Sequence, residues 1–480
     1  MTIGVAAATY SAQLAGRDPA APAVVTESAT WTTAELWARA AAAADWLDEV
    51  GVPAGGLVPA ITATSADALA LSIGALGSGR VLAPLGTRLT VRELAACVEG
   101  LEAPVLVADA GIGEAAAAVA AETGRRLAPL PEFARSRRAL DFGAEPDSVA
   151  MILHTSGTSG LPKQVQIRQD RLATRVRANS ALMGFDAESI YASATGFHHI
   201  AGLGMFVVAL GSGAAVAPYA RFSIDAWRGL EARGVTHTLI VPTIIEMLLG
   251  AGELHSRHLQ VLQYGSSPIH PETLRATVEA LPGVRLIQMF GQTEGSPISI
   301  LTPDDHLLAA SGRPDLLRSV GRAAPGVELR IEAPDADGVG EVLARAEYLF
   351  KVDEEGWLHS GDLGRLDGDG YLYLVGRRGD KIISGGENIY PVEVEQVLAR
   401  HPAVRDVAVV GVLDRYWGEV VKAVLVVADR QHAPSEEELR VFCRRQLAGI
   451  KVPVVWEFRD ELPRSPSGKI LRRLLQEPAP

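Results

Sequence analysis

The sequence predicts an α/β fold that ends in a small α+β unit. Short apolar runs alternate with helical patterns through most of the chain. The pattern changes to short strands with Gly and Asp turns after about residue 320, and a second break follows at residues 376–391. Alternating strands and helices are typical of mainly parallel sheets. We therefore expect a large N-terminal domain of α/β subdomains plus a β-rich subdomain, followed by a small α+β domain.

The length and charge of the chain limit its function class. A chain of 480 residues is long enough for more than one domain. Its net charge of −12 argues against nucleic acid or an anionic membrane as the main partner. Cys97 and Cys443 lie too far apart for a metal motif and suit the reducing cytoplasm. No basic residue precedes Arg17, so we expect no signal peptide.

Elements of the N-terminal part follow from their apolar spacing. The longest uncharged stretch, residues 198–220, contains glycines and paired histidines, which favours a buried helix and turn over a membrane span. Residues 30–50 predict a capped amphipathic helix, and residues 243–252 predict a second helix. Buried strands are predicted by the apolar runs at residues 103–109, 149–153 and 235–242.

Elements of the C-terminal part are shorter. Residues 326–333, 340–346 and 370–378 predict strands of the β-rich subdomain. Beyond the second break, the order helix, strand, strand, helix is predicted for residues 392–402, 404–412, 421–429 and 435–447.

The stretch HTSGTSGLPKQV, residues 154–165, predicts a phosphate-binding loop. Gly157 and Gly160 allow close backbone approach to a ligand, and Lys163 adds a positive charge. Hydroxyl donors come from Thr155, Ser156, Thr158 and Ser159. The stretch lacks the spacing of a Walker A motif. A polar surface turn is the alternative that composition alone leaves open.

Three further stretches carry residues suited to nucleotide chemistry. Thr293 and Glu294 follow a predicted strand, where open α/β sheets bind ligands and where a carboxylate could hold Mg²⁺. Phe290 could stack on a base. Asp362 occupies a tight turn, and a short carboxylate can bind both hydroxyls of a ribose. Lys469 follows a Ser-Gly turn near the C-terminus. Each stretch taken alone also fits a solvated turn or a basic tail.

In combination these stretches resemble the adenylate-forming superfamily of acyl-CoA synthetases, peptide-synthetase adenylation domains and luciferases. Its motifs YTSGTTG-x-PKG, YG-x-TE, TGD and PxxxxGK correspond here to HTSGTSGLPKQ, FGQTE, SGD and PRSPSGK. The resemblance covers nearly the whole chain, and the joint occurrence of the motifs is highly specific. GSSP, residues 265–268, matches the turn at the adenine site. Residues 376–391 match the hinge segment.

The resemblance implies a two-step reaction with ATP, Mg²⁺ and CoA. A carboxylate attacks the α-phosphorus of ATP to give an acyl-adenylate and pyrophosphate, and a thiol then displaces AMP. Lys469 would bridge the carboxylate and the α-phosphate, Thr293 would bond the α-phosphate, and Glu294 with Thr158 would hold Mg²⁺. Asp362 and Arg377 would hold the ribose. The remaining nucleotide-side residues implied are Thr155, Ser156, Gly157, Ser159, Gly160, Lys163, Gly265, Ser266, Ser267, Met289, Phe290, Gly291 and Gln292.

The resemblance also implies a mobile C-terminal lid. We expect an AMP-binding domain at residues 1–379 and a lid at residues 380–480, with the hinge at Asp380. Rotation of the lid between the two steps would withdraw Lys469 and present residues 384–388 to the site. Trp417 would stack on the adenine of CoA, with an ordinary half-buried tryptophan as the alternative. His199 would lie beside the acyl pocket, where a satisfied buried histidine is the alternative.

The candidate acyl pocket favours an apolar or aromatic carboxylic acid, because it lacks the aspartate that amino-acid-activating members usually carry. Its predicted residues are Phe197, His199, Ile200, Leu239, Val241, Gly265, Met289 and Gly291. Two departures from the superfamily pattern stand out. Gln164 replaces the usual glycine after Lys163 and could stiffen the loop, and the segment at residues 341–356 is short.

Three functions remain open at this level. The first is a free-standing acyl-CoA ligase in the cytoplasm, a monomer or homodimer with no membrane span. The second is a stand-alone adenylation enzyme that loads a separate carrier protein. The third, a non-catalytic nucleotide-binding protein, is disfavoured by the presence of Lys469 and Glu294.

Overall fold

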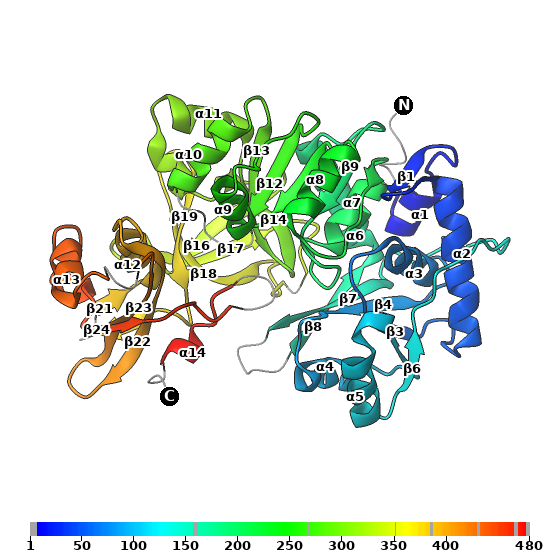
Figure 1. Cartoon of the computed structure of the whole chain (residues 1–480), viewed down its shortest axis with the longest axis horizontal. Helices are drawn as coiled ribbons and strands as arrows, with labels where there is room; N and C mark the ends of the chain where they lie inside the picture. The colour runs from blue at the N-terminus through cyan, green and yellow to red at the C-terminus, as the bar shows by residue number, and fades with distance from the viewer. Residues whose placement is uncertain are drawn as a thin grey trace.

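The computed structural model describes residues 7–156, 162–265, 269, 271–350, 352–384, 387–429, 433–464 and 469–476 (Figure 1). For Ser156, Pro162 and Asn388 it describes the backbone alone. The predicted Gly157, Thr158, Ser159, Gly160, Ser266 and Ser267 lie outside the described residues.

The largest sheet is built around parallel strands, with antiparallel strands at both edges. Its order is β15 (Arg322–Ala323), β14 (Gly295–Leu301), β13 (Arg285–Gln292), β12 (Val261–Gly265), β11 (His237–Ile240), β9 (Ile190–Ser193), β10 (Ala215–Val216), β1 (Pro22–Val25) and β2 (Thr30–Thr32). Because β9, β11, β12 and β13 are parallel, their carboxyl ends meet at one edge of the sheet.

A second sheet is also mostly parallel. Its order is β6 (Arg126–Pro129), β5 (Val105–Ala108), β3 (Leu57–Ile61), β4 (Val81–Leu85), β7 (Val149–Ser156) and β8 (Pro162–Arg168). Strands β7 and β8 pair antiparallel, and they form the two arms that flank residues 157–161. The predicted phosphate loop therefore joins two paired strands at the edge of this sheet.

Helices pack on and between the two sheets. They are α1 (Tyr10–Ala15), α2 (Thr33–Glu49), α3 (Ala66–Leu76), α4 (Val91–Glu99), α5 (Gly113–Thr123), α6 (Gln169–Met183), α7 (Leu203–Gly211), α8 (Ile224–Ala232), α9 (Pro242–Gly250), α10 (Pro271–Ala280) and α11 (Pro303–Ser311). A capping box of Thr32 and Glu35 begins α2, as its sequence predicts. One buried apolar cluster joins α2, α3, α6 and α7 to strands of both sheets. Every residue of α7 is buried, so the uncharged stretch is a core helix.

The C-terminal part contains two smaller sheets. The third sheet is antiparallel, with strands β16 (Glu328–Glu332), β17 (Gly340–Arg345), β18 (Leu358–Leu366) and β19 (Leu372–Arg377). The lid contains β20 (Ile382–Ser384), β21 (Glu387–Ile389), β22 (Val404–Asp414), β23 (Gly418–Val427) and β24 (Val455–Phe458), with α12 (Pro391–Leu398), α13 (Glu436–Arg444) and α14 (Arg473–Gln476). Its apolar residues form clusters of their own. This arrangement confirms the predicted fold class.

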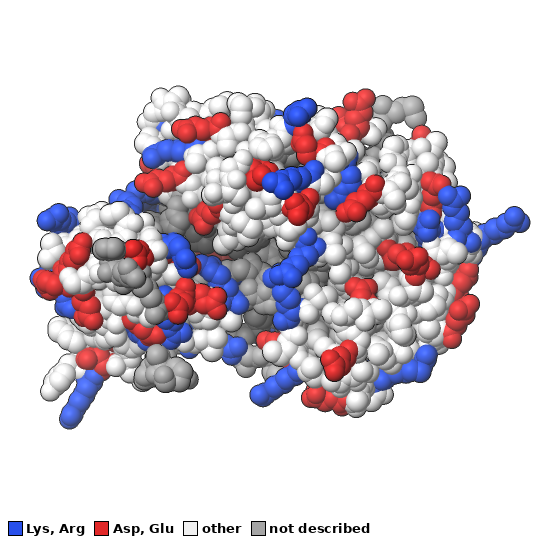
Figure 2. Space-filling model, viewed as in Figure 1, with Lys and Arg blue, Asp and Glu red and all other residues white. Residues whose placement is uncertain are grey.

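A hollow separates the lid from the two large sheets, and Figure 2 shows Lys and Arg side chains on both of its rims. The carboxyl ends of β12 and β13 and the facing side of the lid meet around it (Figure 1). Among the described helices, none has the length and apolar character needed to cross a membrane.

Candidate active site

The carboxyl ends of β12 and β13 lie side by side, with Gly265 paired to Met289. Gly265 has φ +159°, and a Cβ placed there would lie 2.5 Å from the carbonyl oxygen of Met289. Any side chain would therefore force the two strands apart, so the position requires glycine. Met289 is buried, whereas Phe290, Gly291 and Gln292 are partly exposed at the strand end. All five were predicted to bind the nucleotide, with Gly265 and Phe290 at the adenine.

Thr293 and Glu294 form the turn between β13 and β14. The backbone N–H of Phe350 donates to the carbonyl oxygen of Glu294 at 2.7 Å, which fixes the turn against the segment that leads to β18. Both side chains are partly exposed. The described residues contain no cluster of three His, Cys, Asp or Glu side chains that could hold a metal alone. A single carboxylate does fit Mg²⁺, because this ion is commonly held by one or two carboxylates together with substrate phosphates.

The prediction that Asp362 occupies a tight turn was wrong, because it lies within β18, where it faces Arg377 of β19. Nε of Arg377 donates to Oδ1 of Asp362 at 3.0 Å. Burial raises the pKa of the Asp362 carboxyl, while the charges of Arg377 and Lys469 act in the opposite direction. The pair thus places a buried carboxylate, held by a guanidinium, at the wall of the hollow.

Lys469 reaches the same place from the lid. Its side chain keeps exposed surface, yet the surrounding protein shields its ammonium group from bulk water. This burial and the charge of Arg377 lower the pKa of Lys469, and the carboxylates of Asp362 and Glu294 oppose the shift. Lys469 is therefore within electrostatic reach of β18, β19 and the β13–β14 turn. The structure brings together four of the residues predicted for the site.

His199 lies between β9 and α7 and is buried next to His198, with the two ring centroids 3.9 Å apart. Burial, followed by the charges of Lys469 and Arg88, lowers the pKa of His199 to about 4. The imidazole is therefore neutral at pH 7. Its Nε2 has no hydrogen-bond partner among the described residues, which leaves that atom available to a ligand.

The arms of the predicted phosphate loop pair in register. Thr155 lies opposite Lys163, and Ser156 lies opposite Pro162. Gln164 departs from the superfamily pattern, and its Nε2 donates to the carbonyl oxygen of Gly100 at 2.6 Å. Because Gly100 caps α4, this bond joins the outer arm to that helix.

A cavity of about 50 Å³ opens between the ends of the central strands and helices α6 and α7. Five predicted pocket residues line it: Ile200, Leu239, Gly265, Met289 and Gly291. The other three predicted residues do not line this cavity. Phe197 packs in the core against Phe206, Val241 caps α9, and His199 lies beside its neighbour His198. The remaining lining residues are Arg175, Ala201, Met205, Gln263, Tyr264, Gln292 and Ser296.

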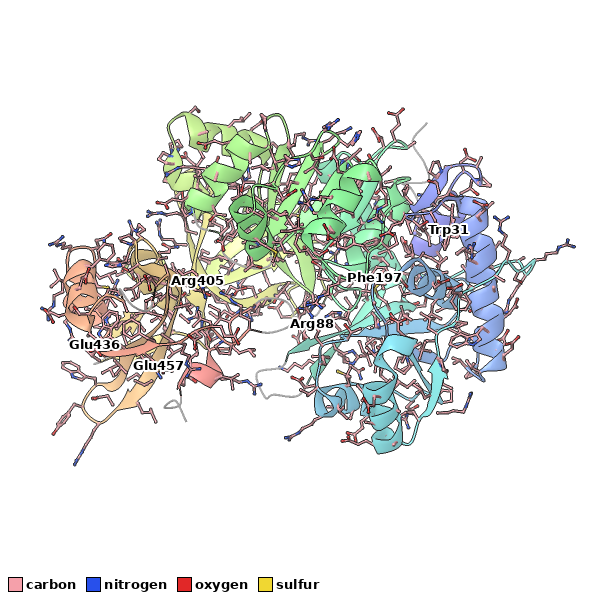
Figure 3. All side chains as sticks on the ribbon, in the orientation of Figure 1. Trp31, Arg88, Phe197, Arg405, Glu436 and Glu457 are labelled. Carbon is pink, nitrogen blue, oxygen red and sulfur yellow. The ribbon has the colours of Figure 1, made fainter. Side chains whose placement is uncertain are left out.

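Two arginines near the site were not predicted. Arg88, in the turn before α4, contributes positive charge at both His198 and His199, and Figure 3 shows it in the middle of the molecule. Arg175, on α6, lines the cavity. A sequence signal for Arg175 exists, because it falls three residues after Leu172 and four before Asn179, both buried on the inner face of the helix.

The lid places Trp417 beside the hinge-proximal hairpin. Gly418 pairs with Ser384, so Trp417 lies next to the described start of residues 384–388. The Trp417 side chain is 53% exposed, and its backbone N–H donates to Oδ1 of Asp414. This position is on the β22–β23 turn of the lid, which Figure 1 shows on the side remote from the hollow.

Asp380 lies in the turn between β19 and β20. Its carboxylate is 3.4 Å from Nε of Arg472, and Arg472 also contacts Glu395 of α12. Arg472 follows Lys469 by three residues, so one guanidinium links the predicted hinge, the body of the lid and the lysine segment.

Comparison with known proteins agrees with this geometry. Residues 12–352 match the AMP-binding enzyme family, and residues 393–469 match the C-terminal domain of AMP-binding enzymes. A fatty acid–[acyl-carrier-protein] ligase from Streptomyces coeruleorubidus is 32% identical, over 96% of this chain and 94% of that protein. A feruloyl-CoA synthase from an Amycolatopsis species is 33% identical, over 97% of each chain.

The fold is also similar to a solved structure. The O-succinylbenzoate coenzyme A synthetase of Bacillus subtilis, in complex with ATP and a magnesium ion, superposes with a TM-score of 0.86 at 28% identity. The match covers 98% of this chain and 99% of that one. Together with the family match over most of its length, this similarity shows that the chain belongs to the AMP-binding enzyme family, the adenylate-forming superfamily that its motifs resemble.

Proposed function

We propose that the protein is an AMP-forming acid–thiol ligase that activates an apolar or aromatic carboxylic acid with ATP and transfers the acyl group to CoA. The observation that carries this proposal is the meeting of Lys469 with Asp362, Glu294 and Arg377. A lid residue and three residues of the N-terminal part converge on one hollow. Their charges suit a nucleotide phosphate better than a folding role, because a buried cation surrounded by partly buried acids is costly to assemble.

The first half-reaction needs charge neutralisation more than a base. A carboxylate oxygen attacks the α-phosphorus of ATP, and the bond to the bridging oxygen breaks as pyrophosphate leaves. The attacking group is already ionised near neutral pH. Lys469 offsets the negative charge that gathers between the two anions, and Thr293 donates a hydroxyl hydrogen bond to the α-phosphate. Glu294 would hold Mg²⁺, which supplies further neutralisation of the phosphates when bound.

The remaining residues position the reactants. Asp362, held by Arg377 at 3.0 Å, accepts hydrogen bonds from the ribose hydroxyls. The strand end at residues 289–292 and the close approach at Gly265 would form the adenine wall. The neutral imidazole of His199 donates to or accepts from the substrate carboxylate without adding charge. Lys163 and the hydroxyl of Thr155 would contact the outer phosphates.

The second half-reaction requires the lid to move. A thiol sulfur attacks the acyl carbon, the thiol proton is lost, and AMP departs. We propose rotation about Asp380, with residues 1–379 fixed and residues 380–480 moving. The adjacency of Trp417 and Ser384 supports this, because one rotation would bring both toward the site as Lys469 leaves. The electrostatic proximity of Lys469 to Asp362 and Glu294 supports assigning its described placement to the adenylate-forming step.

A carrier protein is the second candidate acceptor. Leu413, Tyr416 and Trp417 expose 93%, 88% and 53% of their surface on the β22–β23 turn of the lid. The fatty acid–[acyl-carrier-protein] ligase among the relatives also favours this acceptor. The two cysteines are free and buried, which supports a cytoplasmic location, and we propose a monomer or homodimer.

A carboxylate panel tests the proposal. Pyrophosphate release is measured with ATP, Mg²⁺ and aliphatic, aromatic and amino acids, each with and without CoA. We expect acid-dependent release and CoA-dependent thioester formation. Release without any thioester across the panel would move the assignment to a carrier-protein acceptor. Release that no acid stimulates would contradict the proposed function as a whole.

A further inference from the structure

Arg175 is a buried cation, and two of its nitrogens have no hydrogen-bond partner among the described residues. It belongs to α6 and is among the largest side chains that are less than 2% exposed. Its Nε and Nη1 are shielded from solvent and form no hydrogen bond with any described residue. Its backbone carbonyl oxygen accepts from Asn179, which keeps α6 regular but leaves the guanidinium unsatisfied. Buried polar groups are normally hydrogen-bonded, so this one calls for an explanation.

No carboxylate is among the described groups that act electrostatically on Arg175. The groups that act on it electrostatically are the hydroxyls of Tyr348 and Tyr191, and burial raises the pKa of both tyrosines. Both are therefore neutral at pH 7. The Tyr348 hydroxyl donates to the carbonyl oxygen of Pro297 at 2.6 Å. Burial lowers the pKa of Arg175 to about 10, which still leaves the guanidinium protonated. An unpaired buried charge strongly destabilises a fold.

Arg175 lines the cavity together with Gln263, a second polar side chain with an atom that lacks a hydrogen-bond partner among the described residues. The amide nitrogen of Gln263 contacts only the sulfur of Met289, at 2.9 Å, and its Oε1 has no partner among the described residues. The walls between these groups are apolar, formed by Ile200, Met205, Leu239 and Met289. Such a cavity suits a ligand with an apolar body and one polar end.

The polar end of the cavity is separate from the reacting end of the site. Lys469 and Arg88 act electrostatically on His199, which does not line the cavity, whereas Arg175 does line it. The carboxylate that attacks ATP must meet Lys469. Arg175 is therefore placed for another group of the same substrate, at the end away from the reaction.

We propose that the substrate carries a second carboxylate, at the end remote from the reacting carboxylate. Arg175 and Gln263 bind this second group as a hydrogen-bond acceptor. The inference rests on the proposed function, because the cavity must be the acyl pocket. Its volume of about 50 Å³ limits what lies between the two ends. A water molecule needs roughly 15 Å³ by this measure, so the linker is short.

The experiment compares acids that differ only at the far end. Glutarate, its half-amide and pentanoate share one chain length, and kcat/KM for pyrophosphate release is measured for each with the wild-type enzyme. We expect glutarate to exceed pentanoate by about 100-fold, since a site built to hydrogen-bond a substrate group rejects analogues that lack it. The half-amide should fall between them. A longer or aromatic trio with the same three end groups extends the test.

Arg175→Met removes the charge and keeps the length. We expect the ratio of diacid to methyl-terminated acid to fall to about one. Arg171→Met on the same helix is the matched control and should leave the ratio intact. Because the guanidinium is unpaired, Arg175→Met should melt no lower than the wild type. Gln263→Leu gives an independent variant with a smaller loss of ratio.

The assignment of Arg175 and the proposed function are contradicted by different results. Preference for methyl-terminated acids by the wild-type enzyme, or an unchanged ratio in Arg175→Met, would overturn the assignment of Arg175. If Arg175→Met does not fold, the wild-type ratio and Gln263→Leu still decide. Acid-independent behaviour of the whole panel would instead remove the proposed function.

Discussion

The nucleotide side and the acyl side of the site are built differently. On the nucleotide side, Glu294 lies in a turn, Asp362 lies within β18 and Arg377 ends β19, and their positive and negative charges face one another. On the acyl side, Arg175 comes from the face of a helix and Gln263 from within a strand, and neither has an adequate partner. One side is electrostatically satisfied before any ligand binds, and the other is not.

This difference indicates where the specificity of the enzyme lies. A satisfied arrangement binds the same nucleotide in every member of a family, so its residues can be fixed by short motifs. An unsatisfied buried cation is stable only with a ligand that completes it, so the acyl side discriminates through the cost of leaving Arg175 unpaired. Lys469 joins the two sides, because it acts on Asp362 and Glu294 and also on His199.

The largest expected effect on the reaction rate is at Lys469, which acts on both sides of the site. Lys469→Ala should slow acyl-adenylate formation by about 10²–10³-fold, since it removes a preorganised charge at the reacting phosphate. Chemically prepared acyl-adenylate should still be converted to thioester at close to the wild-type rate. The two half-reactions are measured separately by pyrophosphate release and by thioester formation. Arg473→Ala, an exposed change in the same C-terminal segment, is the control.

A hinge variant gives the reverse pattern. Asp380→Pro restricts φ at the predicted hinge and should spare adenylation while reducing thioester formation. Equal losses in both half-reactions for Lys469→Ala and Asp380→Pro, with the fold intact by circular dichroism, would contradict an alternating lid.

The sequence predicted one side of the site better than the other, and the reason is physical. Glu294 lies in the turn between β13 and β14 and Asp362 lies within β18, next to Gly361, so short local patterns with glycines and polar residues indicate both. The predicted family, fold class and enzyme class are confirmed by the comparisons and the architecture. The individual roles of the site residues stay predictions.

Arg175 was not predicted because the residues of a helix do not by themselves show which of its faces is buried. Four arginines lie between residues 168 and 177, and only packing decides which is buried. The pocket prediction, made from the resemblance to the superfamily, likewise included Phe197 and Val241. Their side chains pack instead into neighbouring parts of the core.

The binding of the thiol acceptor can be tested at Trp417 of the lid. Trp417→Ala should raise KM for CoA by about tenfold, consistent with ~1–3 kcal/mol for stacking on a base, and should leave adenylation unchanged. Tyr416→Ala on the same turn, where the side chain is 88% exposed, is the matched control. Both variants should fold normally because both side chains are solvent-exposed. Unchanged CoA kinetics in Trp417→Ala would exclude the stacking role and favour a carrier protein.

Lowering the pH should lower the free energy of unfolding, because His199 is neutral in the native state. The pKa of His199 is about 4 in the native state and near 6.5 when unfolded. At pH above 6.5 both states are neutral at this residue. As pH falls below 6.5, the unfolded chain binds a proton that the native chain does not. The free energy of unfolding therefore falls by about 1.4 kcal/mol per pH unit until pH 4.

Asp362 on the nucleotide side has the opposite sign. Its native pKa is raised, so protonation on acidification favours the folded state. Urea unfolding between pH 7 and 5 measures the net slope. His199→Asn should flatten the slope by about 1.4 kcal/mol per unit between pH 6.5 and 5. An identical slope in wild type and variant would show that His199 is not buried as a neutral group.

The smallest effect is expected at the outer arm of the phosphate loop, where Gln164 replaces the usual glycine. The side-chain amide of Gln164 donates a hydrogen bond of 2.6 Å to the Gly100 carbonyl oxygen. This hydrogen bond is exposed, and such bonds contribute about 0.5–1.5 kcal/mol to stability. Gln164→Met keeps the side-chain volume and loses the donor, so it should speed amide hydrogen exchange in β8 several-fold and change KM for ATP by less than threefold. Gln166→Met, exposed on the same strand and without a bond to Gly100, is the control. The nucleotide side would then owe its order to paired charges at Asp362 and Lys469, with the arm contributing little. A tenfold rise in KM for ATP in Gln164→Met alone would show instead that the bond to α4 positions the loop.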